Sequence, residues 1–573
     1  MATTANDLTK LIRPARGLSA LLDFACGTHV RAAAFLIVVA LLTFLPGFFQ
    51  IPPIDRDEAR FAQATKQMVE SGEYIDIHFQ DEVRYKKPVG IYWLQSAVIK
   101  TADALGVPRA HSSIWLYRLP SLIGATGAVL LTYWTALAFV SRRAAVLAGL
   151  MRATSIVLGV EARLAKTDAV LLVTILGSMG AMARVYLMQR RSPGAVPGWD
   201  LTAIFWTALA AGILIKGPLA ILFVGLTALT VSILDRSAKW LLALRPLPGL
   251  IWLVVLVAPW FIVILSRAGE TFITESVGTD MLPKIFSNQE GHGAPPGYYF
   301  LLFWVTFWPG AVLAGLAAPM VWQARREPGG QFLLAWLIPS WILFELVVTK
   351  LPHYVLPLYP AIAILIAGIL DRGGLSKARW LQPGTASWFA YPVFMSLLTV
   401  AGFVWLGNDL GLIAWPFAGA AIVMGLFAWR LFEADGAERS LLRGCVAALL
   451  VSFTLFGVLL PSLPALFPSP RIAAELRSSN CPQPVAAAAG YHEPSLVFLA
   501  GTQTRLTDAA GAVDFLRQGP CRFAVLEGRN ERIFAQRAEA AGLRYSPVAR
   551  IDGVNYSIGR AASISIFRSG DAP

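Results

Sequence analysis

Long uncharged stretches dominate this chain and alternate with short polar connections. Several of them run for about 18 residues or more, the length that a helix needs to cross a bilayer. About thirteen such stretches follow one another, at 33–49, 116–140, 144–164, 169–188, 201–215, 219–234, 250–265, 298–322, 332–348, 354–370, 388–406, 412–429 and 444–460. This pattern predicts an all-α polytopic membrane domain of about 13 transmembrane helices over residues 33–460.

Basic residues mark alternate connections between these stretches. They include Arg142/Arg143, Arg190/Arg191, Arg236/Lys239/Arg245, Arg325/Arg326, Arg372/Lys377/Arg379 and Arg439/Arg443, whereas most of the opposite connections are short and nearly uncharged. Positively charged connections stay on the cytoplasmic side of a membrane. We therefore expect a cytoplasmic N-terminal segment over residues 1–32 and the opposite connections outside.

Three longer polar stretches fall on the outer side. Residues 51–115 form a first loop, for which we expect interfacial helices, and residues 267–297 form either a mobile lid over a site or a plain hydrophilic connection. Residues 461–573 predict a small α/β domain, because strand-like runs at 496–499, 523–526 and 564–567 alternate with helical ones. Cys481 and Cys521 could form a disulfide there.

Composition excludes an ordinary soluble protein. The 573 residues are 56% hydrophobic and 14% charged, against about 25% charged in soluble domains. A net charge of +13 is also typical of proteins that bind nucleic acid. Here, however, the basic residues cluster at the ends of apolar stretches, so we expect membrane lipids and no nucleic acid as partners.

Ionisable residues gather at the outer ends of the predicted spans and indicate a polar site on that face. These residues are Asp57, Lys87, Lys166, Asp168, Lys216, Lys350 and His353. Two more, Arg152 and Glu161, fall inside the third span, where they could pair with other helices or extend toward the interface.

The densest motif covers residues 53–61. One interpretation is a helix start with Asp55 as N-cap and Glu58 in the first turn, ending at Gly72. Capping needs only one or two acids, however, and three carboxylates and two guanidinium groups lie within six positions. A site in which carboxylates act chemically is therefore the competing interpretation.

A second motif, at residues 83–93, supplies positive charge. Arg84, Lys86 and Lys87 precede Pro88 and an aromatic pair. Such a cluster suits a phosphate or the headgroup of an anionic lipid.

These motifs resemble a known family. Asp57-Glu58-x-Arg60-Phe61-Ala62, Arg84-Tyr85-x-Lys87-Pro88 and Tyr92-Trp93 are similar to the first periplasmic loop of bacterial aminoarabinose transferases, which belong with protein O-mannosyltransferases to the GT-C glycosyltransferases. Asp168, Lys216-Gly217-Pro218 and Thr349-Lys350-Leu351-Pro352-x-Tyr354-x-Leu356-Pro357 also resemble that family. The chain departs from it at Lys86, where the family usually carries glutamate. A more cationic pocket could suit an acidic sugar.

The resemblance implies an inverting glycosyltransferase of the bacterial inner membrane, with its site and C-terminal domain in the periplasm. It would move a sugar from a polyprenyl-phosphate donor to lipid A or another lipopolysaccharide component. Asp57 and Asp168 would be catalytic. The substrate-binding residues would be Glu58, Arg60, Arg84, Tyr85, Lys87, Lys216, His292, Lys350 and His353. No metal-ligand spacing joins the outward histidines, so we expect no cofactor and no metal.

Two roles are open to Asp57. A carboxylate partly removed from water can have a raised pKa and act as a base. Toward an acceptor phosphate, which is already anionic, it would instead orient the nucleophile and stabilise positive charge at the anomeric carbon. The competing functions are a lipid or sugar transporter, a protein O-mannosyltransferase, and a scaffold whose tail binds a partner.

Overall fold

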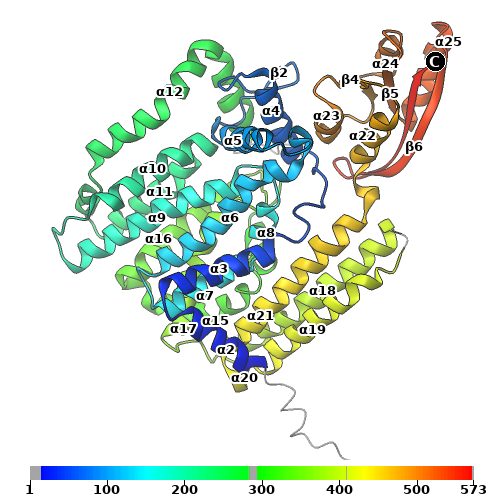
Figure 1. Cartoon of the computed structure of the whole chain (residues 1–573). Coiled ribbons are helices and arrows are strands. Elements are labelled where there is room, and N and C mark those ends of the chain that lie inside the picture. The colour runs from blue at the N-terminus through cyan, green and yellow to red at the C-terminus, as the bar shows by residue number, and fades with distance from the viewer. Residues whose placement is uncertain (1–13, 282, 284–292, 408, 571–573) are drawn as a thin grey trace, which may run out of the picture.

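Long apolar helices form the body of the computed structural model, which describes residues 14–281, 283, 293–407 and 409–570 (Figure 1). The longer helices of this part are α3 (His29–Phe44), α6 (Ile114–Ala136), α7 (Arg142–Ala153), α8 (Ile156–Ala162), α9 (Asp168–Arg191), α10 (Trp199–Lys216), α11 (Leu219–Leu234), α12 (Pro246–Ile273), α14 (Tyr298–Thr306), α15 (Ala311–Gln323), α16 (Pro328–Leu346), α17 (Tyr359–Asp371), α18 (Ser387–Gly402), α19 (Trp415–Arg430) and α21 (Ala437–Ser452). Short α2 (Pro14–Ala25) and α20 (Phe432–Asp435) lie at the end of the bundle away from the C-terminal domain.

Each of the thirteen apolar stretches contains a helix. Within the described residues, eight helices are long and apolar enough to cross a membrane, and the bent pair α7–α8 makes a ninth. Three shorter apolar helices, His29–Phe44, Leu219–Leu234 and Leu356–Asp371, and the split stretch of α14 and α15 account for the others. A multi-pass membrane domain is confirmed, while the count of thirteen stays a prediction.

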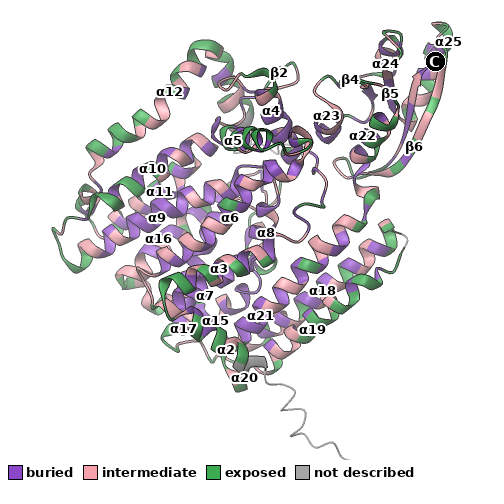
Figure 2. Cartoon of the chain, viewed as in Figure 1, coloured by how far each residue is buried: buried purple, intermediate pink, exposed green. Residues whose placement is uncertain are grey.

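Burial places α9 at the centre of the bundle. It is buried along most of its length, whereas α12, α18 and α19 present exposed apolar side chains on the outside, as lipid-facing helices do (Figure 2). Asp168, the first residue of α9, therefore belongs to the most buried of the eight long apolar helices among the described residues.

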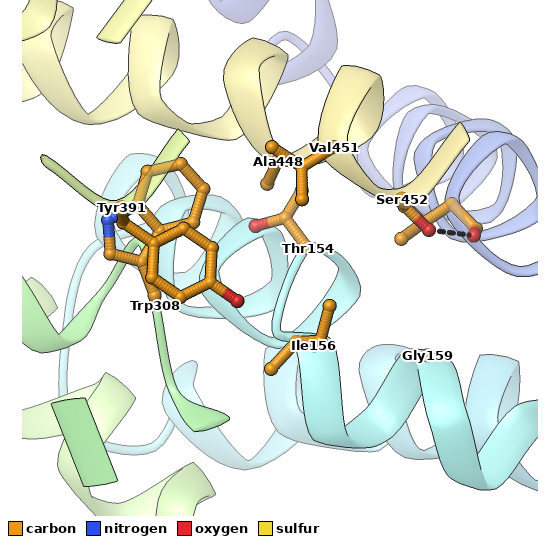
Figure 3. A pocket seen from close by; sticks show the side chains of 9 residues that line it. Thr154, Ile156, Gly159, Trp308, Tyr391, Ala448, Val451 and Ser452 are labelled. Carbon is orange, nitrogen blue, oxygen red and sulfur yellow. Dashed lines mark hydrogen bonds between the residues drawn. The ribbon is translucent and has the colours of Figure 1, made fainter. Parts of the chain in front are cut away.

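The third stretch breaks in its middle. The helices α7 and α8 meet at 63° around Thr154 and Ser155. A small cavity lies at this bend, between α8, α21 and the stacked rings of Trp308 and Tyr391 (Figure 3). None of its lining residues is charged.

The first loop folds into two helices and a small hairpin. They are α4 (Asp57–Ser71), the antiparallel pair β1 (His78–Phe79) and β2 (Glu82–Val83), and α5 (Gly90–Ala104). Gly72 caps α4 in the left-handed conformation, as its position predicts. The expected N-cap is wrong by one residue: Arg56 precedes the helix, and the Asp55 side chain bonds elsewhere.

Residues beyond 467 form a three-layer α/β domain. Its five-stranded sheet has the order β4-β3-β5-β7-β6, with β3 parallel to β4 and β5, and β7 antiparallel to both neighbours. Helices α22 and α23 cover one face and α24 and α25 the other. The elements are α22 (Pro468–Ser478), β3 (Val485–Ala489), α23 (Pro494–Ala500), β4 (Arg505–Thr507), α24 (Ala509–Leu516), β5 (Arg522–Glu527), α25 (Gly528–Ala540), β6 (Tyr545–Asn555) and β7 (Arg560–Ser569).

Two of the three expected strands are confirmed, as β5 and β7. The run at 496–499 is instead part of α23. Pro494 in its first turn favours a helix, and Leu496 packs against the sheet face that α22 and α23 cover. The structure joins Cys481 to Cys521 in a disulfide.

The stretch at 267–297 is helical as far as residue 281, whereas residues 293–297 are not, and Gly293 forms an isolated antiparallel bridge with Thr349. It continues α12 to Ile273 and then η3 (Thr274–Met281), with a kink at Gly269. Lys284 and His292 lie outside the described residues.

Candidate functional site

A cluster of charged side chains joins the beginning of α9 to the end of α10. Asp168 is the first residue of α9 and Lys216 the last of α10, and the Lys216 Nζ lies 2.5 Å from an Asp168 carboxylate oxygen. Both side chains are almost fully buried. Antiparallel packing of these two helices brings the two residues together, 48 positions apart in the chain.

Three further side chains complete the cluster. Lys166 Nζ lies 3.0 Å from Glu161 and 3.6 Å from Asp168, and it is 3.4 Å from His353 Nδ1. The two ring nitrogens of His353 lie 3.6 Å from Glu161 and from Asp168 respectively. Two acids, two lysines and a histidine thus share one buried network.

Asp57 lies at the start of α4 and faces this network. Its side chain keeps accessible surface, although desolvation is the largest single influence on its pKa. Desolvation alone would raise the pKa, but the positive charges of Lys166 and Arg84 outweigh it and hold the pKa below its ordinary value. The expectation of a raised pKa is therefore wrong: Asp57 is a carboxylate at neutral pH and a weak base.

His353 is neutral at the same pH. Burial is the main cause that lowers its pKa to about 3, with Lys166 and Lys216 acting in the same direction and Asp168 opposing them. Lys166 is the reverse case, because the charges of Glu161 and its other acidic neighbours outweigh burial and raise its pKa. The lysine stays protonated, and the imidazole contributes hydrogen bonds rather than charge.

Arg84 brings a third cation toward Asp57. Its guanidinium lies over the Phe61 ring of α4, 5.2 Å from the centroid, and the side chain is buried. The next residue turns away, since the Tyr85 hydroxyl donates to Asp76 at 2.6 Å and its ring packs on Phe272 of α12. Tyr85 thus fixes the hairpin against α12.

Glu58 is fully occupied by an ion pair within the protein. Arg118 of α6 donates to both of its carboxylate oxygens, at 2.8 and 2.9 Å, and the backbone nitrogens of Ile54 and Ala165 donate to the same oxygens at 2.8 Å. With four hydrogen bonds accepted and almost no exposed surface, Glu58 holds the start of α4 in place and offers no free oxygen to a ligand.

The remaining predicted residues lie around the network. The Lys87 side chain is half-buried and donates to the Lys86 carbonyl at 2.8 Å. Lys350 is buried and donates to the carbonyls of Ala294 and Val347, so it fastens the end of the 267–297 stretch. Arg60 is half-exposed on α4, where its charge acts on Asp55.

The structure thus brings together Asp57, Arg84, Asp168, Lys216 and His353. It adds Glu161 and Arg118, whose partners the sequence did not reveal. In both cases the sequence shows a single charged residue inside an apolar stretch. Such a residue indicates a buried ion pair but does not identify the partner.

The arrangement can hold an anionic group and stabilise developing positive charge. Asp57 offers an accessible carboxylate, while Arg84 and Lys166 carry positive charge beside it. Among the described residues, no group of three or more His, Cys, Asp or Glu side chains is placed to hold a metal.

Comparisons with known proteins point to one kind of chemistry. Residues 34–273 match the family model described as dolichyl-phosphate-mannose-protein mannosyltransferase. The chain is 27% identical over 449 residues to the undecaprenyl phosphate-alpha-4-amino-4-deoxy-L-arabinose arabinosyl transferase of Edwardsiella ictaluri, covering 75% of this chain and 76% of that protein. The protein of the same name from Pectobacterium carotovorum is 27% identical over 440 residues, with 73% and 74% covered.

The fold has a counterpart among solved structures. The crystal structure of ArnT from Cupriavidus metallidurans bound to undecaprenyl phosphate superimposes with a TM-score of 0.71 at 18% identity, over 93% of this chain and 97% of that one. Its apo state gives the same values.

Proposed function

We propose that this chain, a GT-C glycosyltransferase related to the aminoarabinose transferases, moves a sugar from a polyprenyl-phosphate donor to lipid A or another lipopolysaccharide component. The observation that carries the proposal is the Asp57 site, where an accessible ionised carboxylate lies beside a buried network of cations and acids. Relatives named for transfer from undecaprenyl phosphate cover three quarters of the chain.

The reaction is a direct displacement at the anomeric carbon. An oxygen of the acceptor attacks that carbon, the bond to the donor's phosphate oxygen breaks, and polyprenyl phosphate leaves with the electron pair. Asp57 is too acidic to act as an efficient base, so a phosphate acceptor, which needs no deprotonation, suits it best. The carboxylate orients the acceptor and stabilises the positive charge that develops on the sugar.

Positive side chains offset the charge on the leaving phosphate. Arg84 and Lys87 follow the hairpin of the first loop, and we assign the donor phosphate to them. Asp168 holds Lys216 and Lys166 in place through an ion pair with each lysine, so the charges of these three side chains offset one another. A single displacement at a single carboxylate inverts the anomeric configuration.

We place the Asp57 site and residues 461–573 in the periplasm and residues 1–32 in the cytoplasm. The arginine pairs 142/143 and 190/191 begin α7 and end α9, at the opposite ends of these segments from Glu161 and Asp168. A disulfide in the C-terminal domain also suits an oxidising compartment.

Reconstituted transfer tests the proposal. The purified protein in proteoliposomes should move a radiolabelled sugar from undecaprenyl phosphate to lipid A, and Asp57→Asn should lower the rate at least about a hundredfold. Asp81→Asn is the matched control, since Asp81 lies exposed in the same loop. A near-normal rate for Asp57→Asn would contradict the assignment.

Mass spectrometry identifies the sugar and the acceptor. Lipid A and core glycan from cells with and without the gene should differ by the mass of one sugar on one molecule. Unchanged glycans together with altered solute uptake would favour a transporter instead.

A further inference from the structure

The C-terminal domain docks along the whole of α4, the helix that begins with Asp57. Helix α23 packs beside α4 (Figure 1), and the Phe498 ring meets Tyr117 of α6 edge to face. Hydrogen bonds run the length of the contact, from Gln63 to Thr502, from Lys66 to the Phe498 carbonyl, and from Thr502 to Glu70. The C-terminal domain is therefore packed against the first loop along α4.

The residue before Asp57 has an unfavourable backbone conformation. Arg56 has φ 69° and ψ −116°, a region that suits glycine. For a residue with a side chain, such a conformation costs about 1–3 kcal/mol and persists only where its surroundings hold it. The turn formed by Asp55 and Arg56 sets the direction in which α4, and with it Asp57, leaves the loop.

The C-terminal domain supplies contacts that hold this turn. The Asp55 backbone nitrogen donates to the Tyr556 hydroxyl at 2.5 Å, and the Ser495 backbone nitrogen donates to the Asp55 carboxylate at 2.9 Å. The Arg56 guanidinium donates to the Ser557 carbonyl. All three contacts join segments more than 400 residues apart in the chain.

Glu493 stiffens the part of the domain that makes these contacts. Tyr556 and Ser557 lie at the tip of the hairpin between β6 and β7, and Glu493 lies buried beneath it. Its two carboxylate oxygens accept from Asn555 Nδ2 at 2.8 Å and from Ser557 Oγ at 2.9 Å. The tip therefore presents the Tyr556 hydroxyl from a fixed position.

We propose that Tyr556 is a positioning residue for sugar transfer: its hydroxyl holds the Asp55–Arg56 turn in its strained conformation and so positions the Asp57 carboxylate beside the buried charged network. This inference rests on the proposed function, which makes Asp57 catalytic. The contacts of Gln63 and Lys66 lie further along α4 and keep the domain docked without Tyr556. Removal of one hydroxyl should therefore affect the turn and leave the docking in place.

Tyr556→Phe tests the inference, with Tyr545→Phe as its matched control. Tyr545 belongs to the same sheet, but its ring packs on Phe534 and Phe567, on the face covered by α24 and α25. We expect Tyr556→Phe to lower kcat about threefold to tenfold, which is the value of one hydrogen bond. The donor KM and the melting temperature should match those of Tyr545→Phe.

Hydrogen–deuterium exchange provides a readout that does not depend on the substrate. In Tyr556→Phe the amides of residues 55–60 should exchange about threefold or more faster, whereas those of residues 63–70 should keep the wild-type rate. Ser557→Ala, which loses only the bond to Glu493, should change both readouts in the same direction and by less.

Each outcome decides one point. Unchanged exchange at residues 55–60, or a kcat equal to that of Tyr545→Phe, would overturn the positioning role. Parallel loss of kcat and melting temperature would reduce Tyr556 to a structural residue. If the wild type transfers no sugar while exchange responds as expected, the proposed function fails and the mechanical link between the hairpin tip and the turn stands.

Discussion

Arg118 allows a quantitative test of what holds the first loop to the membrane domain. Its guanidinium has no exposed surface and donates to Glu58 and to the carbonyls of Phe48, Ile51 and Pro52. Arg118→Met would leave a buried carboxylate without its counter-charge and three carbonyls without donors. Loss of one partner of a buried pair costs about 3–5 kcal/mol, or about two to four orders of magnitude in the folding equilibrium.

Arg372→Met is the matched control. Arg372 forms a similar two-point pair with Glu327, at 2.9 and 2.7 Å, but both side chains are at least half exposed. Such a pair contributes less than about 1 kcal/mol. Equilibrium unfolding in a denaturing detergent should therefore separate the two variants by at least about 2 kcal/mol.

A double variant completes the test. Glu58→Gln combined with Arg118→Met removes the uncompensated charge, so its stability should exceed that of Arg118→Met alone. Equal losses for Arg118→Met and Arg372→Met, or no recovery in the double variant, would refute the view that burial makes this pair decisive.

Three further predictions concern ionisation and charge. The ratio of the wild-type rate to the Asp57→Asn rate should be constant from pH 6 to 8, because the pKa of Asp57 lies below its ordinary value and that of His353 is about 3; a ratio that changes with an apparent pKa near 6.5 would contradict this. Burial and the nearby Glu493 raise the pKa of Asp55 to about 7, so the native state binds an extra proton between about pH 4 and pH 7 and the wild type should lose stability as the pH rises through that range. Asp55→Asn should abolish this slope in thermal melts at pH 5, 6, 7 and 8, and an unchanged slope would exclude Asp55 as its source. A chelator should leave the transfer rate unchanged, because side chains supply the positive charge around Asp57, whereas a loss that added Mg²⁺ or Zn²⁺ restores would show a metal at the site.

Local patterns predicted the elements of this protein well. Apolar length gave a helix in every expected stretch, and Gly72 marked the end of α4. Both signals act within a few residues, through burial and backbone conformation. The run at 496–499 failed because four apolar residues fit a strand or a helix equally, and Pro494 decided between them.

The site was predictable only as a collection of residues. Position at the outer ends of spans identified Asp57, Asp168, Lys216 and His353, since ionisable groups at that depth need a partner. Their pairing depends on how α8, α9 and α10 meet. Glu58 shows the limit: its motif suggested contact with a ligand, but Arg118, 60 positions later, takes both of its oxygens.

The distance along the chain between Asp55 and Ser495 has a consequence for biosynthesis. The two residues are 440 positions apart, so at translation speeds of about 5–20 residues per second, Asp55 leaves the ribosome about 20 to 90 s before Ser495. During that interval the nascent chain already lies in the membrane, and its Asp55–Arg56 turn lacks the contacts with the C-terminal domain. The turn can gain these contacts only once the chain has been synthesised through the hairpin between β6 and β7.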